Sequence, residues 1–242
     1  MSLSVILALA GGAILLVAGL LLRSVGPRLR IGRLLSGTTL VPIDEAVEIA
    51  STDSPRYVRV TGRISSDEEF PDDQNRPLVF RRTRLEILGA DRDWTIVLDE
   101  REAVRFGLET RSAYIAVDDV ALGEGLVVIP RVSAGTVADL PTDMGAEIPP
   151  GTPPETPVRL TIEQVSAVEH ATVVGRPVGG SKGAPTMTSE RGRPLVVTTL
   201  EQAAAMRVLA GGRRGRVVAG AVGLGIGLGL IAASVAAFLI GA

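Results

Sequence analysis

All charged residues of this 242-residue chain lie between positions 23 and 216, and an uncharged stretch flanks them on each side. Residues 3–22 form a run of 20 uncharged residues. A helix of that length spans about 30 Å, the thickness of the hydrocarbon core of a bilayer. The second uncharged run begins at residue 217 and shows no polar face of the kind that a core helix of a soluble protein normally has. The sequence therefore predicts two transmembrane helices, 3–22 and 217–240.

A cleaved signal peptide is the alternative explanation for the first run. The residues before it include no Lys or Arg, no A-x-A cleavage site follows it, and the flanking cations lie on its C-terminal side. These features favour an uncleaved membrane anchor.

Two clusters of arginines border the predicted spans on their inner sides, and no Asp or Glu accompanies them. The first cluster precedes the first acid, Asp44, and the second follows the last acid, Glu201. By the positive-inside rule both clusters face the cytoplasm, so the segment between them is predicted to be cytoplasmic and both termini to lie outside. We call these residues the arginine clusters: Arg23, Arg28, Arg30 and Arg33, and Arg207, Arg213, Arg214 and Arg216.

The segment between the clusters has the opposite sign. Eight of the 25 basic residues belong to the clusters, so residues 34–206 carry 17 basic and 27 acidic side chains, a net charge of −10. The clusters are expected to lie near the headgroups of the lipid bilayer, and the favoured interpretation is that they only set the topology. Specific recognition of anionic lipid, with about 1 kcal/mol of attraction for each arginine near the surface, is the alternative.

Glycines recur four residues apart in the second predicted span. Small residues at this spacing let another helix approach closely, which is how helices gain packing energy in lipid. Ala8 and Gly12 offer the same spacing in the first span. We expect the two spans to pack on each other or on a second copy of the chain. The glycines expected at this contact are Gly223, Gly225, Gly227 and Gly229.

The segment between the arginine clusters is predicted to form a β-rich domain. Apolar and polar residues alternate from Tyr57 to Ile64, which is typical of a half-buried strand. A short helix is predicted within 38–50 and another from the capping-box sequence at 199–202 through Ala210. The predicted fold class is therefore two transmembrane helices flanking an antiparallel β-rich (α+β) domain at 34–206. The other expected strands are 78–88, 94–98, 113–117, 126–132, 158–165, 171–174 and 195–198.

A proline-rich loop, 139–157, divides the β-rich domain into halves, 56–134 and 158–199. The halves share two short motifs in the same order. Val-Thr-Gly-Arg (60–63) matches Val-Val-Gly-Arg (173–176), and Arg-Pro-Leu-Val occurs at 76–79 and at 193–196. A duplicated β-unit would explain the matches, and chance similarity between strand–turn–strand segments is the alternative.

These motifs, with a span at each end, resemble the GIDE-type domain, also called BAM for "beside a membrane". The residues that carry the resemblance are Val-x-Val-x-Gly-Arg-Ile (58–64), Pro-Leu-Val-Phe-Arg-Arg-Thr-Arg-Leu-Glu (77–86), Glu163 and the strands at 173–176 and 193–197. In membrane-anchored E3 ubiquitin ligases this domain lies between two spans and a zinc-binding RING follows; similar domains occur in prokaryotic membrane proteins. The resemblance implies a membrane-anchored recognition domain.

Composition limits the chemistry. The chain has no Cys and one His, His170, whereas a RING binds two zinc ions with about eight Cys or His ligands. Ligase activity is therefore not expected in this polypeptide. A net charge of −2 argues against nucleic-acid binding. The sequence predicts no catalytic residue, no cofactor and no metal site.

One strand carries a candidate binding surface. On it Arg82 and Arg84 point to one face and Arg81 to the other. The first two could bind a carboxylate or phosphate group of a partner, or they could pair across strands with Glu86 neighbours or with the acidic loop at 67–73.

The function expected from the sequence is a prokaryotic integral membrane protein of the cell membrane that presents a non-catalytic interaction or scaffold domain. The alternatives are a substrate-recognition subunit of a ubiquitin-like conjugation or other enzyme system, with the catalytic part supplied in trans, and an enzyme that uses its own carboxylates.

Overall fold

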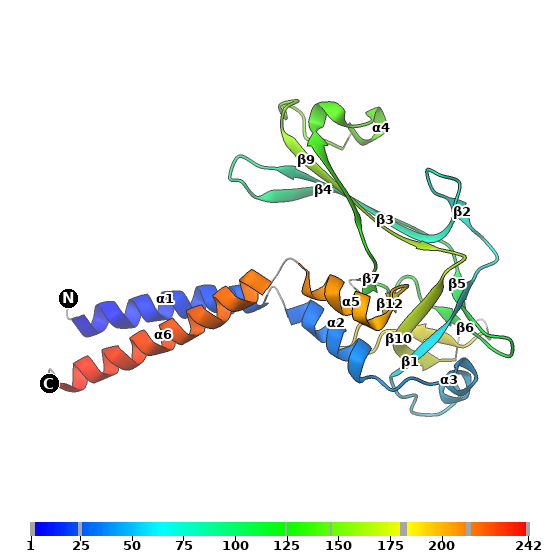
Figure 1. Ribbon diagram of the computed structural model, residues 1–242, viewed down its shortest axis with the longest axis horizontal. Helices are drawn as coiled ribbons and strands as arrows, with labels where there is room; N and C mark the ends of the chain where they lie inside the picture. Colours follow the sequence, from blue (N-terminus) through cyan, green and yellow to red (C-terminus); the bar gives the residue numbers. More distant parts are fainter. Residues whose placement is uncertain are drawn as a thin grey trace. The chain divides into compact units, whose positions relative to one another are not determined.

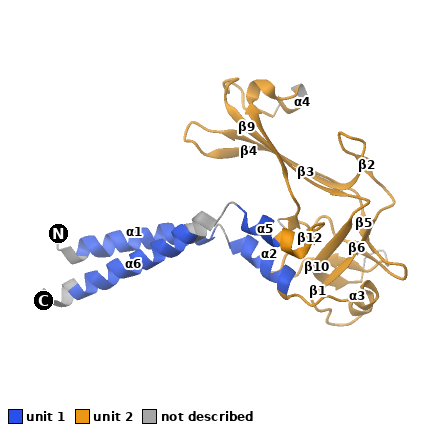
Figure 2. Ribbon diagram, viewed as in Figure 1, with its two compact units in different colours: residues 1–36, 206–242 blue, residues 37–205 orange. Residues whose placement is uncertain are grey.

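The structure is a computed structural model that describes residues 3–23, 26–123, 125–145, 147–179, 183–211 and 214–240 (Figure 1). It divides into two compact units, coloured separately in Figure 2. We call residues 1–36 with 206–242 the helical unit, and residues 37–205 the β unit.

The helical unit is built on two long helices, α1 (Leu3–Arg23) and α6 (Arg214–Ile240), which lie side by side (Figure 1). It also contains most of α2 (Gly26–Gly37) and the C-terminal half of α5 (Gln202–Ala210). Within α6, the segment Val218–Ala236 is long and apolar enough to cross a membrane, whereas the apolar stretch of α1, Val5–Leu20, is shorter.

A closed barrel forms the first part of the β unit. The order β1–β5–β6–β11–β10 closes on itself because β1 also pairs with β10, and the β11–β6 pair alone within this ring is parallel. Two further short strands, β12 (Val196–Thr198) and β7 (Leu126–Val127), extend the sheet from β10. The barrel strands are β1 (Val58–Ser65), β5 (Phe106–Glu109), β6 (Tyr114–Val117), β10 (His170–Val178) and β11 (Thr186–Thr188).

The barrel interior is filled by branched and aromatic side chains such as Val60, Phe106 and Val173, all of them buried. Helix α3 (Ile43–Ala50) packs against the barrel through Ile43, which lies close to Gly62. A Cβ added at Gly62 would lie 2.8 Å from Ile43 Cδ1 and 2.9 Å from the backbone oxygen of Glu109, and because the backbone oxygen cannot easily move aside, a glycine is needed here.

Strands β1 and β10 bring the first shared motif of the two halves together. Val60 lies directly opposite Val173, so Gly62 and Gly175 each follow two residues after the central pair on antiparallel strands. The second shared motif is not placed equivalently. Pro77, Leu78 and Val79 of the first copy lie in β3 (Pro77–Leu88) of the other sheet, whereas Val196, the last residue of the second copy, begins β12. The two halves therefore interlock within one unit, with a local two-fold relation around Val60 and Val173.

A half-barrel forms the second part of the β unit. Its sheet has the order β2–β3–β9–β8, with β4 also paired to β3, and every pairing in it is antiparallel. The long strands β3, β4 and β9 run beside one another in Figure 1. The strands are β2 (Phe70–Pro71), β3 (Pro77–Leu88), β4 (Trp94–Ala103), β8 (Arg131–Thr136) and β9 (Pro157–Ser166).

The proline-rich segment 139–157 connects β8 to β9 and carries the short helix α4 (Thr142–Gly145) after a 3-10 turn, η1 (Val137–Asp139). A capping box begins this turn, in which the backbone N–H and the hydroxyl of Thr136 both donate to Asp139 Oδ2, at 2.8 and 2.7 Å.

The α+β class predicted from the sequence is confirmed in coarse form, as a barrel and half-barrel flanked by N- and C-terminal helices. The sequence prediction was wrong in some local details. The run 126–132 is two strands, β7 and β8, in different sheets, because Pro130 cannot donate to a ladder. Strands β2, β5 and β11 were missed, and the sheet is not purely antiparallel, since β11 and β12 each have a parallel neighbour.

Candidate functional site

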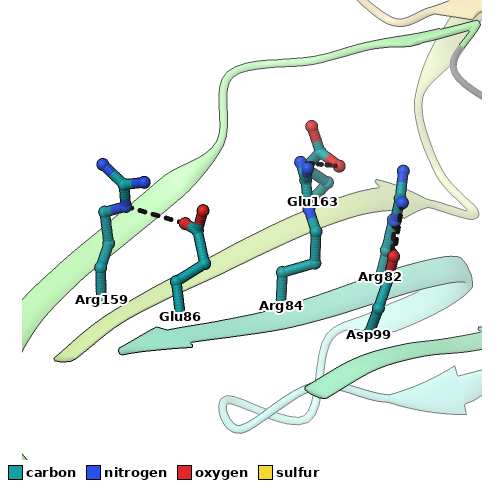
Figure 3. Close-up of polar contacts among 6 residues, drawn as sticks. All are labelled: Arg82, Arg84, Glu86, Asp99, Arg159 and Glu163. Carbon is teal, nitrogen blue, oxygen red and sulfur yellow. Dashed lines mark hydrogen bonds and ion pairs between the residues drawn. The ribbon is translucent and has the colours of Figure 1, made fainter. Parts of the chain in front are cut away.

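Ion pairs cross β3 on one face of the half-barrel (Figure 3). Arg82 donates two hydrogen bonds of 2.7 Å to the two carboxylate oxygens of Asp99 on β4. Arg84, two residues along and therefore on the same face, donates to Glu163 of β9 at 3.1 Å. The hydrogen bond from Arg82 is the largest cause that holds the pKa of Asp99 below its ordinary value. Only 8% of the Arg82 side chain is exposed, and the carboxylate of Asp99 offsets the free-energy cost of burying the guanidinium charge.

A third pair continues the same row. Arg159 of β9 donates its Nε–H to Glu86 of β3 at 2.8 Å, and this bond raises the pKa of Arg159 above its ordinary value. The Arg159 guanidinium also lies 4.5 Å from the centre of the Trp94 ring, within the range of a cation–π interaction. We call these three pairs, Arg82–Asp99, Arg84–Glu163 and Arg159–Glu86, the ion-pair row.

The placement of Arg82 and Arg84 bears on the binding surface predicted for them. They share a face, as the strand periodicity predicts, and each is engaged by a carboxylate of this chain. An incoming acidic group would have to displace Asp99 or Glu163. The geometry thus favours the explanation that Arg82 and Arg84 pair across strands. Their partners, Asp99 and Glu163, are not the residues expected from the sequence, which were neighbours of Glu86 or the acidic loop at 67–73.

The opposite face of the half-barrel carries an open groove of about 820 Å³. Arg81 points to this side, where it pairs with Glu102 at 2.6 Å and lies 5.5 Å from the centre of the Phe70 ring. Apolar side chains from β9 and from the proline-rich segment contribute to the lining, and acidic side chains outnumber basic ones. The lining residues are Asp72, Asp73, Arg81, Thr83, Glu100, Arg101, Glu102, Pro141, Met144, Leu160, Ile162 and Gln164.

The charged lining of this groove carries four carboxylates and two guanidiniums, but Glu102 is paired with Arg81 and the buried Asp72 with Arg76, which leaves Asp73 and Glu100 as its acidic groups outside these pairs. The groove was not predicted from the sequence. Alternation along 158–164 places Leu160, Ile162 and Gln164 on one face, but Pro141 and Met144, which also line the groove, belong to a segment that the sequence predicts only as a loop.

The acidic loop at 67–73 has a structural role at its end. Asp72 is buried and accepts hydrogen bonds from the backbone N–H groups of Gln74 and Arg76 and from Arg76 Nε at 2.7 Å. These contacts, the Arg76 side chain first, hold the pKa of Asp72 far below its ordinary value. Asn75 adopts a positive φ of 57° to complete the turn. Within the described part of the chain, no group of three or more His, Asp or Glu side chains is arranged to hold a metal ion.

Glycines in the helical unit divide into an inner and an outer set. Gly223 and Gly227 face α1, because added Cβ atoms there would lie 3.2 Å from Ala18 Cβ and 2.7 Å from Leu15 Cγ. Cβ atoms added at Gly225 and Gly229 would meet nothing within 4 Å, so these two glycines face away from α1. Half of the predicted set therefore packs the two helices together. Gly11 rather than Gly12 is the contact glycine of α1, and Gly220 joins the inner set.

The outer surfaces of α1 and α6 expose large apolar side chains along their length. Leu16 is 72% exposed on α1 and Leu228 is 60% exposed on α6. Large apolar side chains that are exposed along a helix in this way are typical of a membrane or partner interface.

The described arginines of the clusters are all exposed: Arg23, Arg28, Arg30, Arg33 and Arg207. Arg213 and the side chains of Arg214 and Arg216 lie outside the described residues, as does Lys182.

No family model, no curated protein and no solved structure matches the chain. The resemblance to the GIDE-type domain therefore stays a prediction from the sequence.

Proposed function

We propose that the chain is an integral membrane protein of the cell membrane, anchored by α1 and α6, that presents the β unit in the cytoplasm as an interaction or scaffold domain and is not catalytic by itself. The observation that carries the proposal is the apolar outer surface of α1 and α6, with Leu16 and Leu228 among its most exposed side chains. Such a surface is stable when lipid covers it.

The orientation rests on the arginine clusters, since cationic residues near the ends of spans remain in the cytoplasm. The family resemblance supports the same arrangement, because a GIDE-type domain lies between two spans. With no Cys in the chain, any ubiquitin-like conjugation would need a separate catalytic subunit.

A protein partner would dock on the half-barrel groove or along its edges. Within the described sheet β4 and β8 each pair on one side only, and an extended segment can add to such an edge. The outward glycines, Gly225 and Gly229, offer a second contact, through which two copies of the chain would pack in the bilayer.

The test begins with alkaline extraction of membranes from cells that express the chain, which releases peripheral proteins and leaves integral ones in the pellet. Single cysteines at Ser2, Asp53 and Ala242 are then challenged in intact cells with a thiol reagent that does not cross membranes. No native Cys interferes. The proposal predicts a chain in the pellet, labelled at positions 2 and 242 and protected at 53. Labelling at position 53 alone would show that the β unit lies outside the cell. Release of the chain by alkali would show that α1 and α6 do not anchor it in the membrane.

A further inference from the structure

The eight arginines of the clusters occur in two segments, 1–43 and 202–242, that contain no Asp or Glu at all. The two segments that contain α2 and α5 therefore supply no carboxylate of their own beside these arginines. Among the described residues, no ion pair involves Arg28, Arg33 or Arg207. The ten negative charges in excess on residues 34–206 belong to other segments.

Helix α2 has one buried face and one cationic face. Ile31, Gly32 and Leu35 are buried. A Cβ added at Gly32 would lie 3.4 Å from Met206 Cε, so this face of α2 lies against α5. Arg30 and Arg33 are three residues apart and share the exposed side of the helix.

An exposed leucine accompanies these arginines. Leu29 is 54% exposed, next to Arg28 and Arg30 in the chain. Arginines with an exposed apolar neighbour on a helix are typical of segments that lie in a membrane interface, with the apolar group at the boundary between headgroups and acyl chains.

The covalent chain keeps this surface near the end of the span. Arg28 is five residues after Arg23, the last residue of α1, so even a fully extended chain allows at most about 18 Å between them. Arg207 lies seven residues before Arg214, the first residue of α6. The polar headgroup region begins where the apolar stretch ends, so the arginines of α2 lie within reach of lipid phosphates.

We propose that α2 and the end of α5 form a binding site for the phosphate groups of anionic phospholipids. The guanidinium groups of Arg28, Arg30 and Arg33 donate to phosphate oxygens from α2, Arg207 does so from α5, and Leu29 enters the boundary of the acyl region. Arginine suits this role because its planar group can donate two hydrogen bonds to one phosphate. The inference rests on the proposed membrane anchoring.

Native mass spectrometry of the full chain, released from detergent micelles with equal amounts of phosphatidylglycerol and phosphatidylcholine, tests this site. The wild-type chain is expected to retain phosphatidylglycerol in preference, and Arg33→Gln to lower the preference about fivefold at low salt. The variant R28Q/R30Q/R33Q is expected to lose most of the preference and to keep only the part that Arg207 supplies. A wild-type chain without preference overturns the inference.

The control variant R63Q/R111Q/R191Q removes the same number of charges from exposed positions of the β unit and should keep the wild-type preference. An equal loss in this variant would show that net charge alone selects the lipid, and would argue against a site on α2.

Glycerol phosphate, which has no acyl chains, serves as competitor. If it displaces the lipid at similar concentration, the site is one for free phosphate and the inference is wrong. Alkaline extraction separates this failure from failure of the proposed function, because a chain can remain in the pellet while showing no lipid preference.

Discussion

Arg82 and Asp99 lie diagonally across β3 and β4 and form a doubly hydrogen-bonded ion pair, with both N–O distances 2.7 Å. Arg82 is almost fully buried, whereas about a third of the Asp99 side chain is exposed. Burying a guanidinium is favourable only when a carboxylate accompanies it, so each partner makes the other tolerable in the half-barrel.

Replacement of Arg82 by Ala is therefore expected to lower the free energy of unfolding by about 2 kcal/mol. Removing Arg81, whose pair with Glu102 is far more exposed, should cost only about 0–1 kcal/mol. A double-mutant cycle isolates the two couplings. Urea unfolding of the full chain in detergent, followed by fluorescence of the single tryptophan, Trp94, provides the measurement. Equal couplings for the two pairs would contradict this account of burial.

Acid sensitivity should concentrate at Asp72. Its contacts with Arg76 lower its pKa in the folded chain below the ordinary value of 3.8. The stabilisation is complete above about pH 4 and is lost as the pH falls below it, because the unfolded chain then binds the proton first. Asp72→Asn removes the charge but keeps one acceptor oxygen.

The difference in Tm between wild type and Asp72→Asn is thus expected to be large at pH 7 and to shrink towards pH 3. Comparing differences cancels the contribution of Asp99 and Asp139, whose pKa values are also lowered. Asp73→Asn is the control, since Asp73 is exposed and makes none of these bonds. A constant difference between pH 3 and pH 7 would argue against the charged interaction.

Tyr57 should resist alkaline titration. Its hydroxyl donates to the carbonyl oxygens of Pro194 and Val174, and burial raises its pKa to about 12. Because the pKa is higher in the folded chain than the ordinary value of 10.0, the stabilisation is present below about pH 10 and declines as the pH rises towards 12. Tyr57→Phe is expected to cost about 1 kcal/mol by leaving the carbonyls without a donor.

The chain has two tyrosines, so the titration can be read by subtraction. At pH 11 the folded wild type and Tyr57→Phe should show the same tyrosinate absorbance, because Tyr57 remains protonated. After unfolding in urea at that pH, the wild type should gain one tyrosinate more than the variant gains, because burial also raises the pKa of Tyr114 and Tyr114 contributes equally in both. A wild-type excess in the folded state would mean that Tyr57 ionises like an ordinary tyrosine.

Local features of the fold were predictable because their causes are local. Apolar runs and alternation indicated α1, α6, β1 and β3 within a few residues of their ends. Closure of the barrel depends on the pairing of β1 with β10, which joins residues more than a hundred positions apart and leaves no mark in either strand alone. The short strands β5 and β11 are strands only because neighbours complete them.

The ion-pair row shows the same limit at the level of side chains. Strand periodicity correctly placed Arg82 and Arg84 on one face, but the carboxylates that engage them lie 17 and 79 residues away. Choosing these partners requires the strand order β4–β3–β9, which follows from the fold of the whole unit.

Packing of α1 on α6 gives the last prediction. The spacing of four residues marked two glycine pairs, and helix geometry decides between them, since residues two apart point to opposite sides. A side chain at 227 would meet Leu15 and the Gly11 carbonyl oxygen, whereas one at 225 would meet open space.

Gly227→Leu is expected to separate α1 from α6 and to lower the free energy of unfolding by about 1–3 kcal/mol. Hydrogen–deuterium exchange of the full chain should then quicken in α1 and α6 and stay unchanged in β3 and β9. Gly225→Leu, the matched control, should leave exchange in the helices at the wild-type rate while lowering the fraction of dimer, if copies pack through the outer glycines. Faster exchange in α1 for both variants would contradict the division into inner and outer glycines.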